Sequence, residues 1–271
     1  MTNDTHAALT AAAFGEEPGR WPLPDPTNAR QHWLRAVAAG GQGRYGAALA
    51  DLEAVVRQAP TGPLAAVAHS TRGSFLRQLG GHDLARRYDG QALLLAGDHA
   101  EARADALVGL AADALGVGRF AVSMALLDRA RAQAPVVPPR LVVRRHWVAA
   151  ELAMVTGDAS AAVDHAERAW EFVGQDMVRH RVKSQVVLAG ALCCAGRLDR
   201  ARELAEAALE DAGLLGLIPL RWALCCLLAD IGSSAWTAAE LGDVRDSSAA
   251  LICHRGGIWQ SALRQCEPSA S

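Results

Sequence analysis

The sequence predicts an all-α protein built as a solenoid of stacked helix pairs. Glycines recur every 37 to 39 residues, and a chain breaker follows each of them after seventeen residues. Small residues recur at fixed distances from these glycines, as close packing of two helices requires. A fixed period of this size is typical of two-helix repeat units. We therefore expect each period to hold two antiparallel helices joined at its glycine.

Every period has the same layout around its turn. The glycine lets the chain leave the first helix in a left-handed conformation, and a later Pro or Gly ends the second helix. The turn glycines are Gly43, Gly80, Gly118, Gly157 and Gly196. The small residues five positions later are Ala48, Ala85, Ser123, Ala162 and Ala201. The chain breakers are Pro60, Gly97, Pro135, Gly174 and Gly213.

Residues 1–28 are expected to form a Pro-rich N-terminal tail with a short helix near its start, because prolines from Pro18 onward favour extended backbone. The solenoid is expected over 29–232. Its first five helix pairs are expected at 29–40 with 45–59, 64–79 with 83–96, 100–116 with 120–134, 140–156 with 159–173, and 178–195 with 198–212. A sixth first helix is expected at 217–231.

The pattern degenerates after this sixth helix, where Ser233, Ser234 and Trp236 interrupt it. Terminal repeats of a solenoid need a polar outer face, so 233–271 is expected to be a degenerate last unit with irregular capping helices. Asp246 or Ser247 is expected to cap one of them. The other is expected from an apolar stripe formed by Ile258, Trp259, Ala262, Leu263 and Cys266.

The repeated unit resembles the tetratricopeptide repeat, which has small residues at the helix crossing, an aromatic residue in the turn and a closing Pro. The matching segments are Gly43-Arg44-Tyr45 with Ala48 and Pro60, Gly118-Arg119-Phe120 with Pro135, Gly157-Asp158, and Gly196-Arg197-Leu198 with Ala201. The resemblance spans roughly 29–213, with units a few residues longer than the family's period of about 34. It implies a right-handed superhelix whose first helices line a concave groove.

The resemblance also implies which residues face this groove. They stand ten positions before each turn glycine and are Trp33, Ser70, Val108, Trp147, Val186 and Trp222, with Glu151 added from the row six positions before. Tryptophan is enriched at binding hot spots, so Trp33, Trp147 and Trp222 are candidate anchors for a partner. They could equally fill gaps between neighbouring first helices, and the sequence leaves both roles open.

A second candidate surface is a basic edge at the start of two consecutive first helices. Positive charge is disfavoured at helix N-termini, where backbone N–H groups attract anions. An acidic peptide, a phosphate or a nucleic-acid backbone would suit such an edge, although its charges could instead be paired with acids of neighbouring loops. The residues are Arg140, Arg144, Arg145, Arg179, His180, Arg181 and Lys183.

Composition and motifs exclude several classes of function. The net charge of −2 over 271 residues argues against general binding of polyanions. GxGxxG at 41–46 follows a predicted helix, whereas a dinucleotide fingerprint follows a strand. The sequence contains neither a GxSxG elbow nor an HExxH motif, so we expect no enzymatic activity. The six cysteines have no zinc-ligand spacing and are expected to be reduced, and we expect neither a metal nor a cofactor.

No segment reaches the ~18 apolar residues of a membrane helix, and the N-terminus lacks the features of a secretory signal, so a cytoplasmic protein is expected. The function expected is that of a non-catalytic adaptor or regulator, which binds an extended or helical segment of another protein in its groove. The basic edge would favour acidic partners, and homo-oligomerisation stays open. Two alternatives are a regulatory sensor of a small ligand or peptide and an RNA-associated helical repeat protein.

Overall fold

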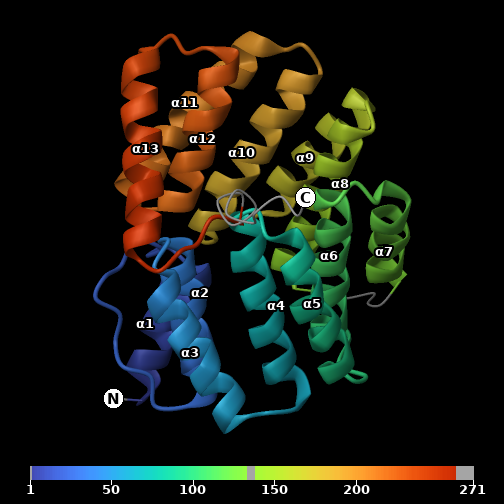
Figure 1. The fold of residues 1–271 in the computed structure, drawn as a ribbon, viewed down its shortest axis with the longest axis vertical. Helices are drawn as coiled ribbons and strands as arrows, with labels where there is room; N and C mark the ends of the chain where they lie inside the picture. Colours follow the sequence, from blue (N-terminus) through green and yellow to red (C-terminus); the bar gives the residue numbers. More distant parts are fainter. Residues whose placement is uncertain (1, 133–137, 261–271) are drawn as a thin grey trace, which may run out of the picture.

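The computed structural model describes residues 2–132 and 138–260, and within these ranges it is all α-helical, with thirteen helices (Figure 1). Consecutive helices pack against each other, as in a repeat array. The helices are α1 Thr2–Phe14, α2 Ala29–Gly41, α3 Tyr45–Gln58, α4 Gly62–Gln78, α5 His82–Leu95, α6 Ala100–Gly116, α7 Phe120–Ala132, α8 Pro139–Val155, α9 Ala159–Phe172, α10 Val178–Cys194, α11 Leu198–Leu214, α12 Ile218–Ile231 and α13 Ala238–His254.

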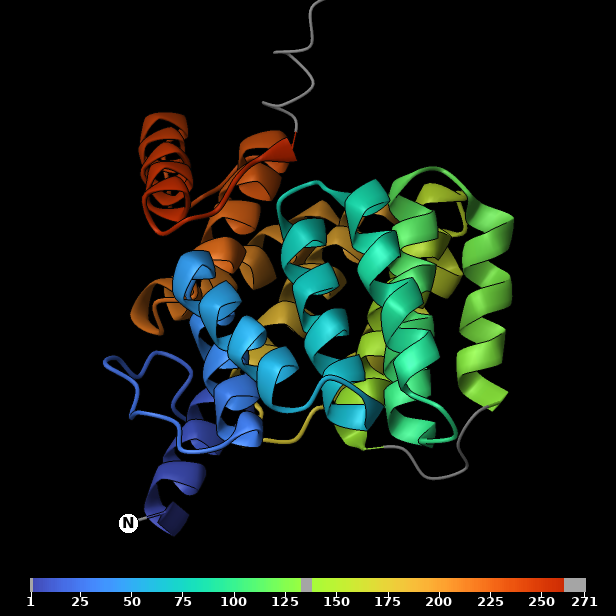
Figure 2. The same cartoon turned by 60° about the horizontal axis from the view of Figure 1, so that its bottom comes forward.

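The five predicted helix pairs are confirmed as α2–α3, α4–α5, α6–α7, α8–α9 and α10–α11, and their bounds agree with prediction to within two residues. The first helices of neighbouring units also contact one another, from α2 against α4 to α10 against α12. Figure 2 shows the helices of the middle units standing side by side. The expected end of the third pair at 134 lies outside the described residues.

The turn glycines adopt the predicted left-handed backbone. All five have positive φ, from +72° at Gly43 to +83° at Gly80. One chain breaker was misassigned, because α11 continues through Gly213 to Leu214 and the next turn uses Gly216, with φ of +63°. A glycine with ordinary helical φ does not end a helix, whereas a positive φ does.

The predicted helix crossings are confirmed by burial. The small residues at Ala48, Ala85, Ser123, Ala162 and Ala201 have no exposed surface. Ser123 fills its slot with a hydroxyl that donates a hydrogen bond to the carbonyl oxygen of Ala111, 2.9 Å away. These small side chains let the two helices of a unit approach closely, and larger residues beside them form the core.

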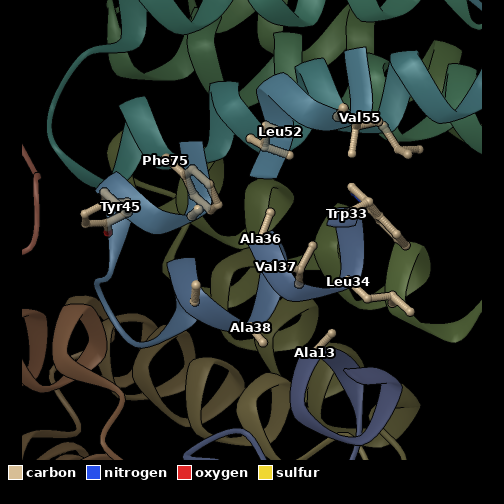
Figure 3. Packing of buried hydrophobic residues seen from close by; sticks show 14 of the residues in the cluster. Ala13, Trp33, Leu34, Ala36, Val37, Ala38, Tyr45, Leu52, Val55 and Phe75 are labelled. Atoms are coloured by element: carbon tan, nitrogen blue, oxygen red, sulfur yellow. The ribbon is translucent and has the colours of Figure 1, made fainter. Parts of the chain in front are cut away.

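The N-terminal segment packs onto the array. Leu9, Ala12 and Ala13 of α1 are buried, and Figure 3 shows Ala13 beside Leu34 and Ala38 of α2 in a common cluster. The amide nitrogen of the Gln42 side chain donates to the carbonyl oxygens of Pro18 and Arg20, at 2.9 and 3.0 Å. The segment expected as a tail therefore continues the fold of the first unit.

The C-terminal cap differs from the expectation. One long helix, α13, replaces the capping helix expected to begin at Asp246 or Ser247, and both residues lie in its interior. It begins at Thr237, whose side chain and that of Glu240 form a capping box that satisfies two backbone N–H groups. The expected final helix with Ala262, Leu263 and Cys266 falls largely outside the described residues.

The array curls so that its last unit contacts its first. The Gly46 N–H donates to the carbonyl oxygen of Arg255 at 2.8 Å, and the Arg255 guanidinium donates to that of Gln42 at 2.8 Å. Ile218 of α12 and Ile252 of α13 belong to the core cluster of the N-terminal units. In Figure 1, α13 accordingly ends beside α2 and α3. The first helices thus line the inner face of the curled array, and the two ends of the array contact each other.

Candidate binding site

Two of the three candidate tryptophan anchors serve to join neighbouring first helices. Trp33 is buried, and its indole N–H donates to the Thr71 hydroxyl of the next first helix at 3.0 Å. Trp147 repeats the arrangement with the Ser184 hydroxyl at 2.9 Å. Each hydroxyl residue stands about one period after its tryptophan, which is the sequence signal that could have identified the pairs. Both indoles are therefore hydrogen-bonded to the next first helix, and Trp147 keeps part of its surface exposed.

Two of the five remaining members of the predicted groove row are also buried. Ser70 and Val108 are buried, and Val186 packs partly buried against the core of the last units. Glu151 forms an ion pair with Lys183 at 3.2 Å. The row is therefore partly buried and partly exposed along these units, and its member Trp222 borders an open cleft.

Trp222 lies in a cleft between the C-terminal helices α12 and α13 and the end of α4 in the second unit. Its ring centroid is 4.6 Å from that of Trp259. The cleft has a volume of about 570 Å³, and its other lining residues are Arg77, Gln78, Leu79, Gly80 and Ala249. It therefore combines two aromatic rings with a polar rim contributed by the end of α4 and the turn that follows it.

The residues of the predicted basic edge have different surroundings in the structure. Arg140 pairs with Glu101 at 2.6 Å, and Arg144 pairs with Asp105. The acids come from the preceding first helix, α6, and the Lys183–Glu151 pair repeats this arrangement between α10 and α8. These three cations therefore form ion pairs within the protein, as expected if the charges of the edge are paired internally. Their acidic partners lie on helices and not, as expected from the sequence, in neighbouring loops.

Three other members of the edge have different surroundings. The Arg181 guanidinium lies 4.7 Å from the ring centroid of Trp170, towards the second helices. Burial lowers the pKa of Arg145, and the positive charge of nearby Arg131 lowers it further. His180 is buried and stacked on Trp147 with 5.5 Å between ring centroids. Burial, and then the charges of nearby arginines, lower the pKa of His180 well below its ordinary value.

Like Arg145 and Arg181, Arg179 forms no ion pair with an acid in the part of the chain that the structure describes, but its Nε is also buried without a hydrogen-bond partner. Its guanidinium donates one long hydrogen bond, 3.4 Å to the carbonyl oxygen of Ala13, and its shielded Nε has no partner there. Burial, followed by the positive charges of Arg144 and Arg140, lowers its pKa to about 10. An unbalanced cation therefore lies where α10 meets α1.

A buried ionic network near the second and third units was missed from the sequence. Asp89 of α5 has no exposed surface and pairs with Arg77 of α4, which also binds Asp113 of α6 at 2.8 Å. The carboxylate of Asp89 is wedged against Gly73 and Gly109, one on each of the two first helices beside it. Burial raises the pKa of Asp113 to about 7. In the sequence, the signal that could have indicated this network was the presence of charged residues near glycines inside the predicted helices.

Other candidate chemistry is absent from the residues described. Across 2–132 and 138–260, no group of three or more His, Cys, Asp or Glu side chains is placed to hold a metal ion. The cysteines in these ranges are free, and burial raises the pKa of the Cys225 thiol to about 11. The GxGxxG match at 41–46 follows α2, so its preceding element is a helix. Over the same ranges, no helix has the length and apolar character needed to span a membrane.

No protein-family model matches the chain, and no curated protein matches it significantly.

Proposed function

We propose that this chain is a non-catalytic protein-binding module of the tetratricopeptide type that holds a segment of a partner protein. The periodic helix pairs with their glycine turns support this reading, because stacked units of this kind act mainly as binding surfaces. Cytoplasmic adaptors and regulators are the class to which we assign it.

The observation that carries the proposal is the cleft at Trp222. Indole rings that are partly accessible beside a polar rim are typical centres of protein interfaces. Trp33 and Trp147 donate to neighbouring hydroxyls and are occupied within the array, whereas Trp222 and Trp259 line an open volume of about 570 Å³. An apolar side chain of an extended partner segment would pack on the two rings, with the exposed side chain of Gln78 at the rim.

Site-specific photo-cross-linking tests this proposal. A benzophenone amino acid at position 249, inside the cleft, should form an adduct with a discrete partner in native cell extract. The same amino acid at position 86, on the exposed side of α5, is the matched control and should not form that adduct. The adduct at position 249 should persist in high salt, because screening weakens mainly contacts between exposed charges.

A pair of variants then tests the role of the ring. Trp222→Ala should abolish the adduct, and Trp222→Phe should retain part of it, since an aromatic face remains. Circular dichroism must show both variants to be folded. An adduct that forms equally at positions 249 and 86, or that survives Trp222→Ala in a folded protein, would rule out the cleft as the binding site.

Of the two alternatives, the ligand sensor has an observation in its favour, namely the unbalanced Arg179. The RNA-associated alternative has none comparable, because Arg140, Arg144 and Lys183 each have a carboxylate partner. We therefore do not propose RNA binding.

A further inference from the structure

The inner face near the start of α10 carries more positive than negative charge. Four arginines lie close together there. Burial lowers the pKa values of Arg30, Arg144 and Arg179, and the charges of neighbouring arginines lower them further. Among the described residues, two carboxylates form ion pairs with them, Glu101 and Asp105. The arginines are Arg30, Arg140, Arg144 and Arg179. These four arginines therefore outnumber by two the carboxylates that form ion pairs with them.

Arg179 is the centre of this imbalance. A guanidinium has five N–H donors, yet this one makes a single long hydrogen bond to a backbone carbonyl, and its Nε is shielded from water without a partner. A shielded cation without a counter-charge is costly, and proteins normally pair such groups or bind an ion to them. The chain supplies no carboxylate to Arg179 among the residues described, so an external anion is the missing partner.

The neighbouring groups hold Arg179 in place and leave it accessible. The side chain passes against Gly41 of α2, where a Cβ would lie 2.8 Å from its Cδ. Phe14 of α1 lies between Arg140, at 5.5 Å from its ring centroid, and His180, at 6.2 Å between ring centroids. The side chains of Arg140 and Arg144 keep 13% and 21% of their surface exposed, and Arg179 is half-buried. Each of these three side chains therefore keeps part of its surface exposed to solvent.

We propose that Arg140, Arg144 and Arg179 form a binding site for a small multivalent oxyanion on the inner face of the array. Planar guanidinium forks match phosphate and carboxylate oxygens in bidentate geometry, and several of them together suit a group with two or more negative charges. The donors of Arg140 and Arg144 that do not contact Glu101 or Asp105 would share the anion with Arg179.

Such a ligand would link three units. Arg140 and Arg144 begin α8, Arg179 begins α10, and the carbonyl next to Arg179 belongs to α1. The anion would neutralise the repulsion among the arginines and stabilise the contact between the N-terminal unit and the fifth. This site is separate from the Trp222 cleft and does not depend on partner binding there.

Pyrophosphate is a direct probe of the site. Titration of the full chain at constant ionic strength, set with NaCl, should show saturable binding by calorimetry. It should also raise the melting temperature, by about 3–5 °C once pyrophosphate is in roughly hundredfold excess over its Kd. Malonate serves as a second arm, since tighter binding of the dicarboxylate at the same site would assign the natural ligand to that class. If neither probe binds at millimolar concentration, the proposal is wrong.

Charge variants locate the binding. Arg179→Gln should weaken binding at least tenfold and remove the rise in melting temperature, whereas Arg179→Lys should weaken it less. Arg200→Gln, an exposed arginine on α11, makes the same charge change elsewhere and should behave as the wild type. General stabilisation by salt would affect all variants equally, so an unchanged response in Arg179→Gln would also overturn the proposal.

The ligand-free variant supplies an independent readout. Because Arg179 has no acidic partner to lose, Arg179→Gln without any ligand should melt at the same temperature as the wild type or higher. A ligand-free variant that is much less stable, or that does not fold, would mean that the protein itself compensates this cation. That result would contradict the anion site even if pyrophosphate bound the wild type.

Discussion

Gly109→Ala is the sharpest test of how the units are packed. Gly109 lies in the interior of α6, where an alanine would ordinarily stabilise a helix by about 1 kcal/mol. Here a Cβ would lie 2.5 Å from Cγ of Asp89, far inside van der Waals contact. Asp89 is fully buried and tied to Arg77, so it can move only by breaking that pair.

The expected loss follows from these two opposing effects. Breaking a buried ion pair costs about 3–5 kcal/mol, and the gain in helix propensity returns about 1 kcal/mol. Gly109→Ala should therefore lower the free energy of unfolding by about 2–4 kcal/mol. At roughly 2 °C per kcal/mol for a chain of this size, the melting temperature should fall by roughly 4–8 °C.

Gly90→Ala is the matched control. Gly90 follows Asp89 directly and lies inside α5, but no atom stands within 4 Å of its added Cβ. It should raise the free energy of unfolding by about 0.5–1 kcal/mol. The two substitutions are chemically identical, so only their surroundings can give them opposite signs.

Urea unfolding followed by circular dichroism at 222 nm measures both variants. In an Asp89→Ala background the obstruction is gone, and Gly109→Ala should then stabilise the protein as Gly90→Ala does. If Gly109→Ala is as stable as the wild type, or loses the same stability without Asp89, the reasoning from the wedged carboxylate is refuted.

Three further changes test other parts of the fold. Ala162→Leu should overpack a crossing that has no exposed surface and cost about 1–3 kcal/mol, and an unchanged urea midpoint would mean that α8 and α9 do not touch there. Trp147→Phe removes the hydrogen bond to Ser184 and should cost about 1 kcal/mol, with no loss of helicity by circular dichroism. Burial raises the pKa of Asp113 to about 7, so the folded chain holds a proton that the unfolded chain loses above its pKa of 3.8. Stability should therefore fall as pH rises from about 4 to about 7, and the urea midpoint of Asp113→Asn should fall less over the same range.

The repeating architecture was predictable because its determinants are local. A turn glycine must adopt positive φ, and a helix crossing must have a small residue, wherever the neighbouring units lie. Gly43 and Ala48 therefore show the same spacing as Gly196 and Ala201, and both pairs behave as predicted. Gly213 misled the prediction because a glycine can also sit inside a helix, as it does in α11.

The surroundings of the candidate binding residues were less predictable from the sequence, because they depend on which residues meet across units. Trp33, Trp147 and Trp222 occupy the same register in the sequence, yet the first two donate to hydroxyls of the next unit and the third borders a cleft. Likewise, Arg144 and Arg179 begin equivalent helices, but only Arg144 finds an acid, Asp105, on the preceding first helix.

The sequence by itself determined the all-α class, the period, the five turn glycines and, to within two residues, the bounds of the five helix pairs, since backbone conformation and close approach of helices act over a few residues. The tertiary structure alone decided that the array curls until Arg255 reaches Gln42, across 213 residues, and that the inner face holds an unbalanced cation. Small rotations between successive units add up along the array. Contacts between its two ends therefore depend on all the units together and cannot be predicted from any single repeat.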